Sequence, residues 1–498
     1  MAYKPTIGLE IHAELKTNSK MFCGCKNDPD EKRPNYNICP VCTAQPGTLP
    51  VANEEAIKKV IKTGLALNCK IAEDSKFDRK NYFYPDLPKG YQISQYDQPI
   101  ASGGWLEIRN SKLETRKIRI TRIHLEEDTG SLMHPEGADY SLVNLNRAGV
   151  PLMELVTEPD ITSGKEAREF AEELRLIFKY LGVSDADMEK GQMRVEVNIS
   201  ISKGKKLGTK VEIKNLNSFR VVEKAIDFEI KRQEEVLESG EKGSPVGLRP
   251  RIVQETRGWH DKKEITFSQR EKEEAHDYRY FPEPDLPPMH FDKDYIKEIK
   301  LSMLELPEQK RERFKKEYGL DDASIEFFVT NKDLSEYYEK VVSEFEEWTQ
   351  EEEKDQAHIK ASKLVANYLI SDAQGLLSGK EFVEKNFKIT PENFAEFVKM
   401  IFKGEISSKV AKMVIAEMFS TGGDPSTIVD DNNWRQMSDD SELEKIVKGV
   451  IEKNSKAVED YKKGKQNSLQ FMAGQVMKET RGTASPGKVQ ELLKKFLN

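Results

Sequence analysis

The sequence lacks long hydrophobic stretches. No segment approaches the ~18 uninterrupted apolar residues of a membrane-spanning helix, and the mean hydropathy is −0.67. An integral membrane protein built from helices is therefore excluded. The first ten residues, MAYKPTIGLE, contain no apolar core of a signal peptide. We therefore expect a cytoplasmic protein with no secretory signal and no membrane partner.

Self-sufficient catalytic motifs are also missing. There is no G-x-x-x-x-G-K-[ST] phosphate loop, no G-x-G-x-x-G segment that opens a helix and no G-x-S-x-G turn. No internal repeat of fixed period is present. These absences leave carboxylates and histidines on predicted strands as the conspicuous polar residues.

A surplus of positive charge is absent as well. The 498 residues include 78 Lys and Arg against 86 Asp and Glu, for a net charge of −8. This argues against a protein that coats nucleic acid without selectivity. The charge is uneven, because residues 441–498 carry +5 and the first 440 residues carry −13. A basic tail of this kind indicates either a local anionic partner or a solvated, lysine-rich helical face.

Cysteine is scarce, but four of the five cysteines lie close together. The first pair has the spacing C-x-C and the second has C-x-x-C. Two pairs of closely spaced thiolates can complete a tetrahedral sulfur site, which predicts a structural zinc ion. Two disulfides are the competing interpretation, which a reducing cytosol disfavours. The predicted ligands are Cys23, Cys25, Cys39 and Cys42, whereas Cys69 is expected to be a small core residue.

The length predicts two to four domains, and the first part of the chain has the pattern of a sheet protein. Residues 118–125 and 193–200 alternate with period two, as half-buried strands do. Two amphipathic helices are expected in this part, one from the N-cap Ser163 to Gly182 and one over about residues 217–240. The predicted fold class is α+β, built on an antiparallel sheet.

The second part of the chain is predicted to be all-α. The proline-rich segment 281–288 cannot continue a helix, and we interpret it as a boundary. Beyond it, Thr390 caps a helix that starts with Pro391. The last helix is expected from Gly487 to Leu497.

Acidic residues on predicted strands are the candidates for chemistry. Glu10 and His12 share one face of a strand, and His124 and Glu126 share another, from which Glu127 points away. Strand periodicity does not show whether these residues meet.

Glu154 interrupts the otherwise apolar run 150–156. A carboxylate buried there needs a partner, and a Mg²⁺ ion held by several carboxylates and one imidazole would satisfy them together. The other interpretation is that Glu10, Glu127 and Glu154 pair with nearby Arg and Lys residues.

A set of long motifs resembles the GatB family, the B component of the glutamine-dependent aspartyl/glutamyl-tRNA amidotransferases. The motifs occur in one order from residue 7 to residue 285, and the helical remainder matches as well. They are residues 7–12, 75–86, 92–95, 124–128, 145–147 with Gly149, 158–160, 214–219, 255–257 and 277–285.

The resemblance implies a fold and an activity. The fold would be a cradle domain over residues 1–292 with a zinc knuckle at 23–42, a helical domain over 293–405 and a YqeY-like, tRNA-binding tail over 406–498. The activity would be that of a carbon–nitrogen ligase, active only in a heterotrimer with an amidase component (GatA) and a small component (GatC). ATP and Mg²⁺ would serve to phosphorylate the side chain of Glu-tRNA(Gln) or Asp-tRNA(Asn). Ammonia from the amidase would then displace the phosphate and give Gln-tRNA(Gln) or Asn-tRNA(Asn).

The resemblance also implies roles for particular residues. The catalytic Mg²⁺ site maps onto Glu10, His12, Glu127 and Glu154, although the choice between Glu126 and Glu127 stays open. The ammonia tunnel would open at Lys80 and Tyr82, unless Tyr82 is a packed aromatic residue. Arg79 and Arg147 would contact phosphate or form surface ion pairs. The predicted tRNA contacts in the tail are Lys478, Arg481 and Lys488.

Two other functions are compatible with the residues alone. One is a nonenzymatic tRNA-binding adaptor whose carboxylates are structural. The other is a metal-dependent nuclease or phosphatase that would hydrolyse its substrate without ATP, and the lack of a spaced Asp-rich motif counts against it.

Overall fold

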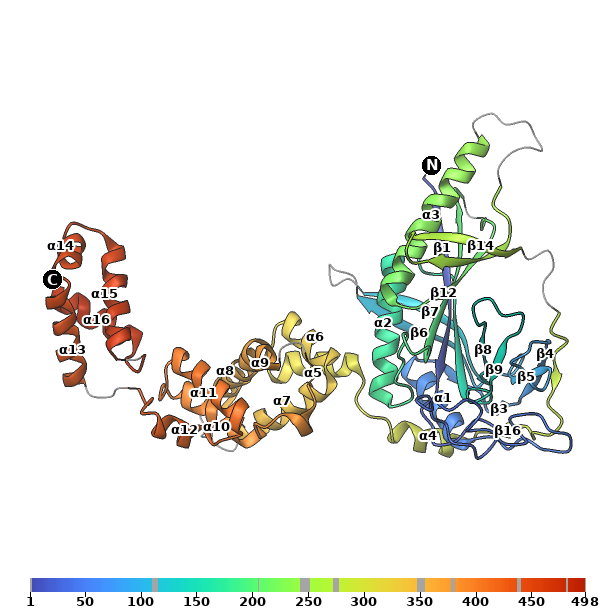
Figure 1. Ribbon diagram of the computed structural model, residues 1–498, viewed down its shortest axis with the longest axis horizontal. Coiled ribbons are helices and arrows are strands. Elements are labelled where there is room, and N and C mark those ends of the chain that lie inside the picture. Colours follow the sequence, from blue (N-terminus) through green and yellow to red (C-terminus); the bar gives the residue numbers. More distant parts are fainter. Residues whose placement is uncertain are drawn as a thin grey trace. The chain divides into compact units, whose positions relative to one another are not determined.

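A computed structural model of the chain divides it into two compact units, Met1–Leu306 and Pro307–Asn498 (Figure 1). The residues that it describes are 2–109, 115–204, 206–241, 251–271, 277–346, 354–377, 380, 382–436, 440–480 and 482–497. The first unit is mixed α/β with a large sheet, and the second is helical. This agrees with the predicted order of a sheet-containing part followed by helices.

Within the described residues, the first unit is organised around a nine-stranded sheet. Neighbouring strands run antiparallel except β12 and β13, which are parallel because α3 connects them as a crossover. The strand order is β14 (Ile265–Glu271), β13 (Glu255–His260), β12 (Val211–Leu216), β11 (Met193–Ser202), β1 (Lys4–Glu14), β10 (Pro151–Thr157), β7 (Thr115–Glu127), β6 (Ala101–Arg109) and β2 (Lys70–Ile71).

Two long helices, α2 (Gly164–Leu181) and α3 (Phe219–Glu241), pack on the sheet (Figure 1). As predicted, Ser163 caps α2, with its hydroxyl accepting a hydrogen bond from the Glu166 N–H, and Gly182 ends the helix in the left-handed conformation.

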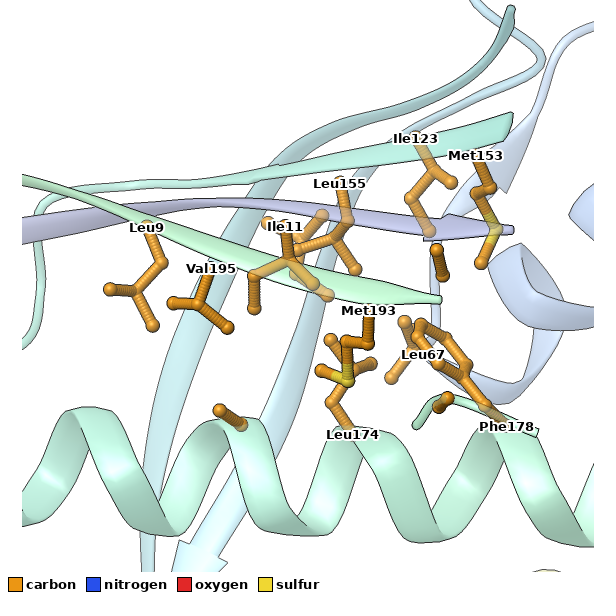
Figure 2. Close-up of a cluster of buried hydrophobic side chains, with 14 of the residues drawn as sticks. Leu9, Ile11, Leu67, Ile123, Met153, Leu155, Leu174, Phe178, Met193 and Val195 are labelled. Carbon is orange, nitrogen blue, oxygen red and sulfur yellow. The ribbon is translucent and has the colours of Figure 1, made fainter. Parts of the chain in front are cut away.

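Apolar side chains from the centre of the sheet form the core under α2. Figure 2 shows Ile11 of β1, Leu155 of β10 and Val195 of β11 in one cluster with Leu174 of α2, which covers this face of the sheet. All four side chains are buried, and each contributes about 1.5–3 kcal/mol of burial free energy. The opposite face of these strands is therefore free to carry polar residues.

Smaller elements complete the first unit. A three-stranded sheet is formed by β15 (Phe281–Pro282), β4 (Asp78–Asn81) and β5 (Tyr91–Ser94). The prolines of 281–288 therefore lie inside this unit, because a short extended segment can pair at a sheet edge even where proline prevents a helix. The remaining elements are β3 (Asp74–Ser75), which pairs with β16 (Met289–His290), β8 (Ser131–Met133), which pairs with β9 (Leu142–Asn144), α1 (Glu54–Ala66) and α4 (Lys293–Leu301).

A bulge in β7 determines which of its side chains face the core. Ile118 and Ile120 are buried, and so are Ile123 and Leu125. The inward positions thus change from even to odd numbers where the register with β10 shifts, opposite Val156 and Thr157. Beyond the bulge, even-numbered residues of β7 lie on the polar face.

The second unit contains short amphipathic helices. Thr390 caps α10 through a hydrogen bond from the Asn393 N–H, and Pro391 is the first helical residue, as predicted. Among the described residues, no helix combines the length and the apolar character that crossing a bilayer requires. The helices are α5 (Pro307–Glu317), α6 (Asp322–Thr330), α7 (Lys332–Glu346), α8 (Lys354–Asn367), the π-helix Tyr368–Ala373, α9 (Gln374–Leu377), the 3₁₀-helix Glu384–Asn386, α10 (Pro391–Phe402), α11 (Ser408–Thr421), α12 (Pro425–Asp431), α13 (Asp440–Lys453), α14 (Ser455–Lys462), α15 (Gln466–Glu479) and α16 (Pro486–Leu497).

Candidate functional site

Three neighbouring strands carry the candidate site on the polar face of the large sheet. His12 of β1 lies opposite Glu154 of β10, and Glu154 lies opposite His124 of β7. Side chains that are opposite each other in antiparallel strands project from the same face, with Cβ atoms about 5 Å apart. The three residues therefore form one row, and Glu126, two positions beyond His124, lies on the same face.

The side chains of this row converge. His12 Nε2 lies 3.3 Å from Glu154 Oε2 and 3.7 Å from Glu126 Oε1. One ligand atom from each of these three residues lies within 4.8 Å of the others. Adjacent ligands of an octahedral Mg²⁺ ion are about 2.9 Å apart and opposite ligands about 4.2 Å, given Mg–O distances of about 2.0–2.1 Å. The donor types and spacings of this cluster fit a magnesium ion.

Burial and neighbouring charges oppose each other in the cluster. Burial raises the pKa of Glu154, but His124 and His12 lower it by more, so that it lies well below its usual range. Burial also raises the pKa of Glu126, but Lys80 and His124 together outweigh this effect, so that its pKa lies below the usual value. Burial lowers the pKa of His12, whereas Glu154 raises it, for a net pKa of about 9. Two carboxylates and an imidazolium are therefore the preferred state without a bound cation.

Glu127 lies on the opposite face of β7. Its carboxylate binds Lys89 Nζ at 2.6 Å and accepts the Ile93 N–H at 3.0 Å. The structure thus places Glu126, and not Glu127, beside His12, because one residue step along a strand reverses the side-chain direction. The predicted magnesium set named Glu127 and left open the choice between Glu126 and Glu127; in the structure the carboxylate of Glu127 lies outside this cluster.

Glu10 belongs to a second acidic group. It lies opposite Glu196 of β11, and ligand atoms of Glu10, Glu196 and Glu212 lie within 4.8 Å of one another. Lys214 Nζ lies 2.8 Å from Glu196 and 3.5 Å from Glu212. Burial and the neighbouring carboxylates raise the pKa of Glu10. Of the four predicted ligands, His12 and Glu154 therefore lie in the first group, Glu10 lies in the second, and Glu127 lies in neither.

Sequence reasoning missed Glu196 and Glu212. The alternation over residues 193–200 places Glu196 on the polar face of its strand. The pairing of β11 with β1 and β12, which brings both carboxylates to Glu10, is set by tertiary structure.

Lys80 of β4, in the small sheet, places a positive charge near the carboxylates of the first cluster. Burial lowers the pKa of Lys80, but Glu126 and further anionic groups raise it above its usual value. Its Nζ lies 5.2 Å from the ring centroid of Tyr278, and Tyr82 packs edge-on against the same ring at 6.0 Å. A lysine and two aromatic rings thus adjoin the carboxylates, and the half-buried ring of Tyr82 contacts that of Tyr278.

A serine on β5 fixes the orientation of Glu126. Ser94 Oγ donates a hydrogen bond to Glu126 Oε2 at 3.0 Å, and both side chains are buried. The next residue, Gln95, accepts the Leu125 N–H through Oε1 at 3.0 Å. Because β5 also pairs with β4, which carries Lys80, these bonds fix the position of Glu126 relative to Lys80.

The four clustered cysteines also converge. Their Sγ atoms lie within 4.8 Å of one another, and those of Cys39 and Cys42 are 3.9 Å apart. Four sulfurs around zinc at about 2.3 Å would be separated by about 3.8 Å, whereas a disulfide requires about 2.05 Å. All five cysteines are free thiols, and Cys69 is buried as predicted. The cage formed by Cys23, Cys25, Cys39 and Cys42 fits a zinc ion.

The two candidate arginines are engaged within the protein. Arg79 Nε and Nη2 each donate to the Glu283 carboxylate at 2.7 Å. Arg147 donates to the carbonyl oxygens of Thr129 and Gly130 at 3.1 and 2.7 Å. Arg147 Nε also lies 3.5 Å from Asp128 Oδ2, so each arginine has a carboxylate partner within the protein, as the ion-pair alternative predicts.

The predicted tRNA contacts lie near the junction of α15 and α16. Lys478 is exposed in the last turn of α15, and Lys488 is exposed in the first turn of α16. Arg481 lies outside the described residues.

Comparison with known proteins decides the family. A family model described as the GatB/GatE catalytic domain matches residues 5–297, and one described as the GatB domain matches residues 345–497. Proteins named as the B component of aspartyl/glutamyl-tRNA(Asn/Gln) amidotransferase match along the whole chain. The Persephonella marina protein is 49% identical over 100% of both chains, and the Thermotoga maritima protein is 46% identical over 100% of this chain and 99% of its own.

The chain belongs to this GatB family. The similarity extends to Caldanaerobacter subterraneus, whose GatB protein is 48% identical over 100% of both chains. Membership of the GatB family confirms the resemblance indicated by the sequence motifs.

Proposed function

We propose that the row His12–Glu154–Glu126, with Lys80 beside it, is the place where this chain phosphorylates the side-chain carboxylate of an amino acid misacylated on tRNA. The predicted role as the GatB component of a tRNA-dependent amidotransferase, a ligase, is confirmed by membership of the family. The observation that carries the site assignment is the convergence of a half-buried imidazole and two buried carboxylates on one polar face of the large sheet, with the charge of Lys80 acting on them from the small sheet.

Phosphoryl transfer to a carboxylate brings two anions together, so the site must supply positive charge. A bound Mg²⁺ ion would neutralise phosphate oxygens and orient ATP, and His12, Glu126 and Glu154 would hold it. Lys80 supplies a fixed ammonium group close to these ligands. Glu10 with Glu196 and Glu212 offers a second set of oxygen ligands on the same face, adjacent to the first.

The second chemical step needs ammonia as a nucleophile. In bulk water ammonia is protonated, so its delivery requires a shielded route. Lys80 and Tyr82 border the cluster on the side of the small sheet, and we assign the mouth of this route to them. The proposed partners are an amidase that releases ammonia from glutamine, a small third component, and Glu-tRNA(Gln) or Asp-tRNA(Asn). The proposed location is the cytoplasm.

Two further parts of the chain have supporting roles in this proposal. The cage of four cysteines holds a structural zinc ion, because its sulfur spacing matches tetrahedral coordination. The tail over residues 406–498 holds the tRNA through phosphate contacts. Lys478, Lys488 and the undescribed Arg481 are the proposed contacts.

Reconstitution tests the function directly. The chain, co-expressed with its two partners and supplied with ATP, Mg²⁺, glutamine and Glu-tRNA(Gln), is expected to form Gln-tRNA(Gln) and ADP. Omission of ATP or Mg²⁺ should abolish the product. Amidation that persists in a Glu154→Ala complex would favour the adaptor function, and nucleic acid hydrolysis without ATP would favour the nuclease. Failure with both Glu-tRNA and Asp-tRNA would refute the proposal.

Removal of the Ser94 hydroxyl should weaken magnesium binding. Ser94→Ala deletes the donor that orients Glu126, and loss of such an outer-shell bond reduces metal affinity about 10–100-fold. The Mg²⁺ concentration for half-maximal amidation should rise accordingly, with a smaller change in the rate at saturating Mg²⁺. Ser184→Ala is the matched control, since Ser184 is also buried but accepts the Ala186 N–H in a turn after α2, away from the cluster. An identical Mg²⁺ dependence of both variants would contradict this role.

A further inference from the structure

Lys20 is a buried lysine whose ammonium group contacts a cysteine sulfur and a backbone carbonyl oxygen. Its side chain is 1% exposed. Its Nζ donates to Cys42 Sγ at 3.7 Å and to the Leu145 carbonyl oxygen at 3.2 Å. Among the described residues, no carboxylate lies within ion-pair distance of this nitrogen. A buried ammonium group requires a compensating negative charge, and the sulfur of Cys42 is the group that can carry it.

The four-cysteine cage, in turn, would carry an excess of negative charge. Zinc bound by four thiolates leaves a net charge of −2, which is unfavourable where water is excluded. Cys42 is the one buried member of the cage, at 5% exposure, while the other three are partly exposed. Its Sγ receives a hydrogen bond from the Cys39 N–H at 3.2 Å in addition to that from Lys20. The positive charge therefore lies at the sulfur that solvent reaches least.

Lys20 and its neighbour Met21 connect the cage to the strand that carries Glu154. The Lys20 N–H donates to the Cys25 carbonyl oxygen at 2.9 Å, and the Met21 N–H donates to that of Gly149 at 2.7 Å. A Cβ atom added to Gly149 would lie 3.5 Å from the Cβ of Cys42, so the cage packs directly on this turn. The turn leads into β10 at Pro151.

We infer that Lys20 is the outer-shell cation of the zinc site, which neutralises the Cys42 thiolate and attaches the cage to the turn before β10. The inference rests on the proposed zinc site. It predicts that zinc affinity depends on the charge of residue 20, and that the burial of Lys20 depends on the metal.

The first test measures metal binding in the full-length chain. Wild type, Lys20→Met, Lys20→Arg and Lys26→Met are compared by chelator competition for zinc and by the absorption spectrum of the cobalt-substituted protein. Lys20→Met should bind zinc about 10–100-fold more weakly, with its sulfur-to-cobalt charge-transfer band shifted to longer wavelength. Lys20→Arg should retain most of the affinity, because it keeps the charge. Lys26→Met removes an exposed lysine one residue beyond Cys25 and should resemble wild type.

A second test uses the unaltered protein, so it holds even if Lys20→Met does not fold. Amine acylation read by mass spectrometry should label Lys20 slowly in the zinc-loaded chain and much faster after chelation, while Lys26 labels rapidly in both states. The role of Lys20 would be overturned if wild type and Lys20→Met had equal zinc affinities and cobalt spectra. It would also be overturned if the acylation rate of Lys20 were the same with and without zinc. Failure of wild type to bind zinc or cobalt at this cage would instead refute the zinc site itself.

Discussion

Exchange of Glu126 for Gln should lower ATP-dependent amidation by about 10²–10³-fold in the assembled complex, the size of effect seen when a fixed electrostatic group is removed from a reaction centre. The amide keeps the shape of the side chain but removes a charge that faces His12 and attracts Lys80. Glutamine hydrolysis by the amidase and tRNA binding should be unaffected. Initial rates of Gln-tRNA and ADP formation, titrated with Mg²⁺, provide the measurement.

Glu127→Gln is the matched control. The two glutamates are adjacent and each is 2% exposed, but Glu127 pairs with Lys89 on the other face of β7. Its loss leaves the half-buried ammonium group of Lys89 without its carboxylate, which reduces the free energy of unfolding by about 1–3 kcal/mol. The amidation rate of the folded complex should change little. The double variant Lys89→Met/Glu127→Gln should recover much of the lost stability.

The contrast between these neighbours separates chemistry from folding. Thermal unfolding should report a large effect for Glu127→Gln, and steady-state rates should report the large effect for Glu126→Gln. If Glu127→Gln lost amidation to the same extent while still folded, the assignment of Glu126 to the cluster would be wrong.

Local signals were sufficient to predict the helix α2. Its N-cap Ser163 and its left-handed C-cap Gly182 act through hydrogen bonds within a few residues, so the sequence around them contains the necessary information. The same holds for Thr390 and Pro391 at the start of α10.

The polar face of β7 was harder to predict. Uniform alternation from Ile118 would place His124 on the same face as Ile118 and Ile120, which are buried in the core. The bulge before Ile123 changes this assignment, and it depends on how β7 pairs with β10. Alternation did predict that Glu126 and Glu127 face opposite ways, but the choice between them required the packed structure.

Convergence between strands was not predictable from one sequence. More than a hundred residues of sequence separate His12 from His124 and Glu154. The register of β1, β10 and β7 brings the three residues into a row. The second acidic group depends in the same way on the neighbours β11 and β12. The cysteine cage was predictable because its spacing within residues 23–42 is itself the signal.

Removal of residues 437–498, the last part of the tail, should weaken tRNA binding strongly and leave the first unit folded. Helices α13–α16 enclose a hydrophobic cluster of their own, which includes Leu443, Met472 and Leu493, so their loss does not open the core of the large sheet. Residues 441–498 also carry the +5 charge. Removal of several phosphate contacts should raise the KM for tRNA about 10²-fold or more at physiological salt, with a smaller effect on kcat.

Single substitutions distinguish phosphate contacts from a general loss of structure. Lys478→Ala, Arg481→Ala and Lys488→Ala should each reduce the slope of log Kd against log salt by about one if the residue neutralises one phosphate. Lys297→Ala, on the exposed face of α4 in the first unit, should leave the slope unchanged. Because an acidic chain repels RNA overall, the bound state depends on where its positive charge is concentrated. Unchanged tRNA affinity after removal of the tail would show that another surface binds the tRNA and would refute this assignment.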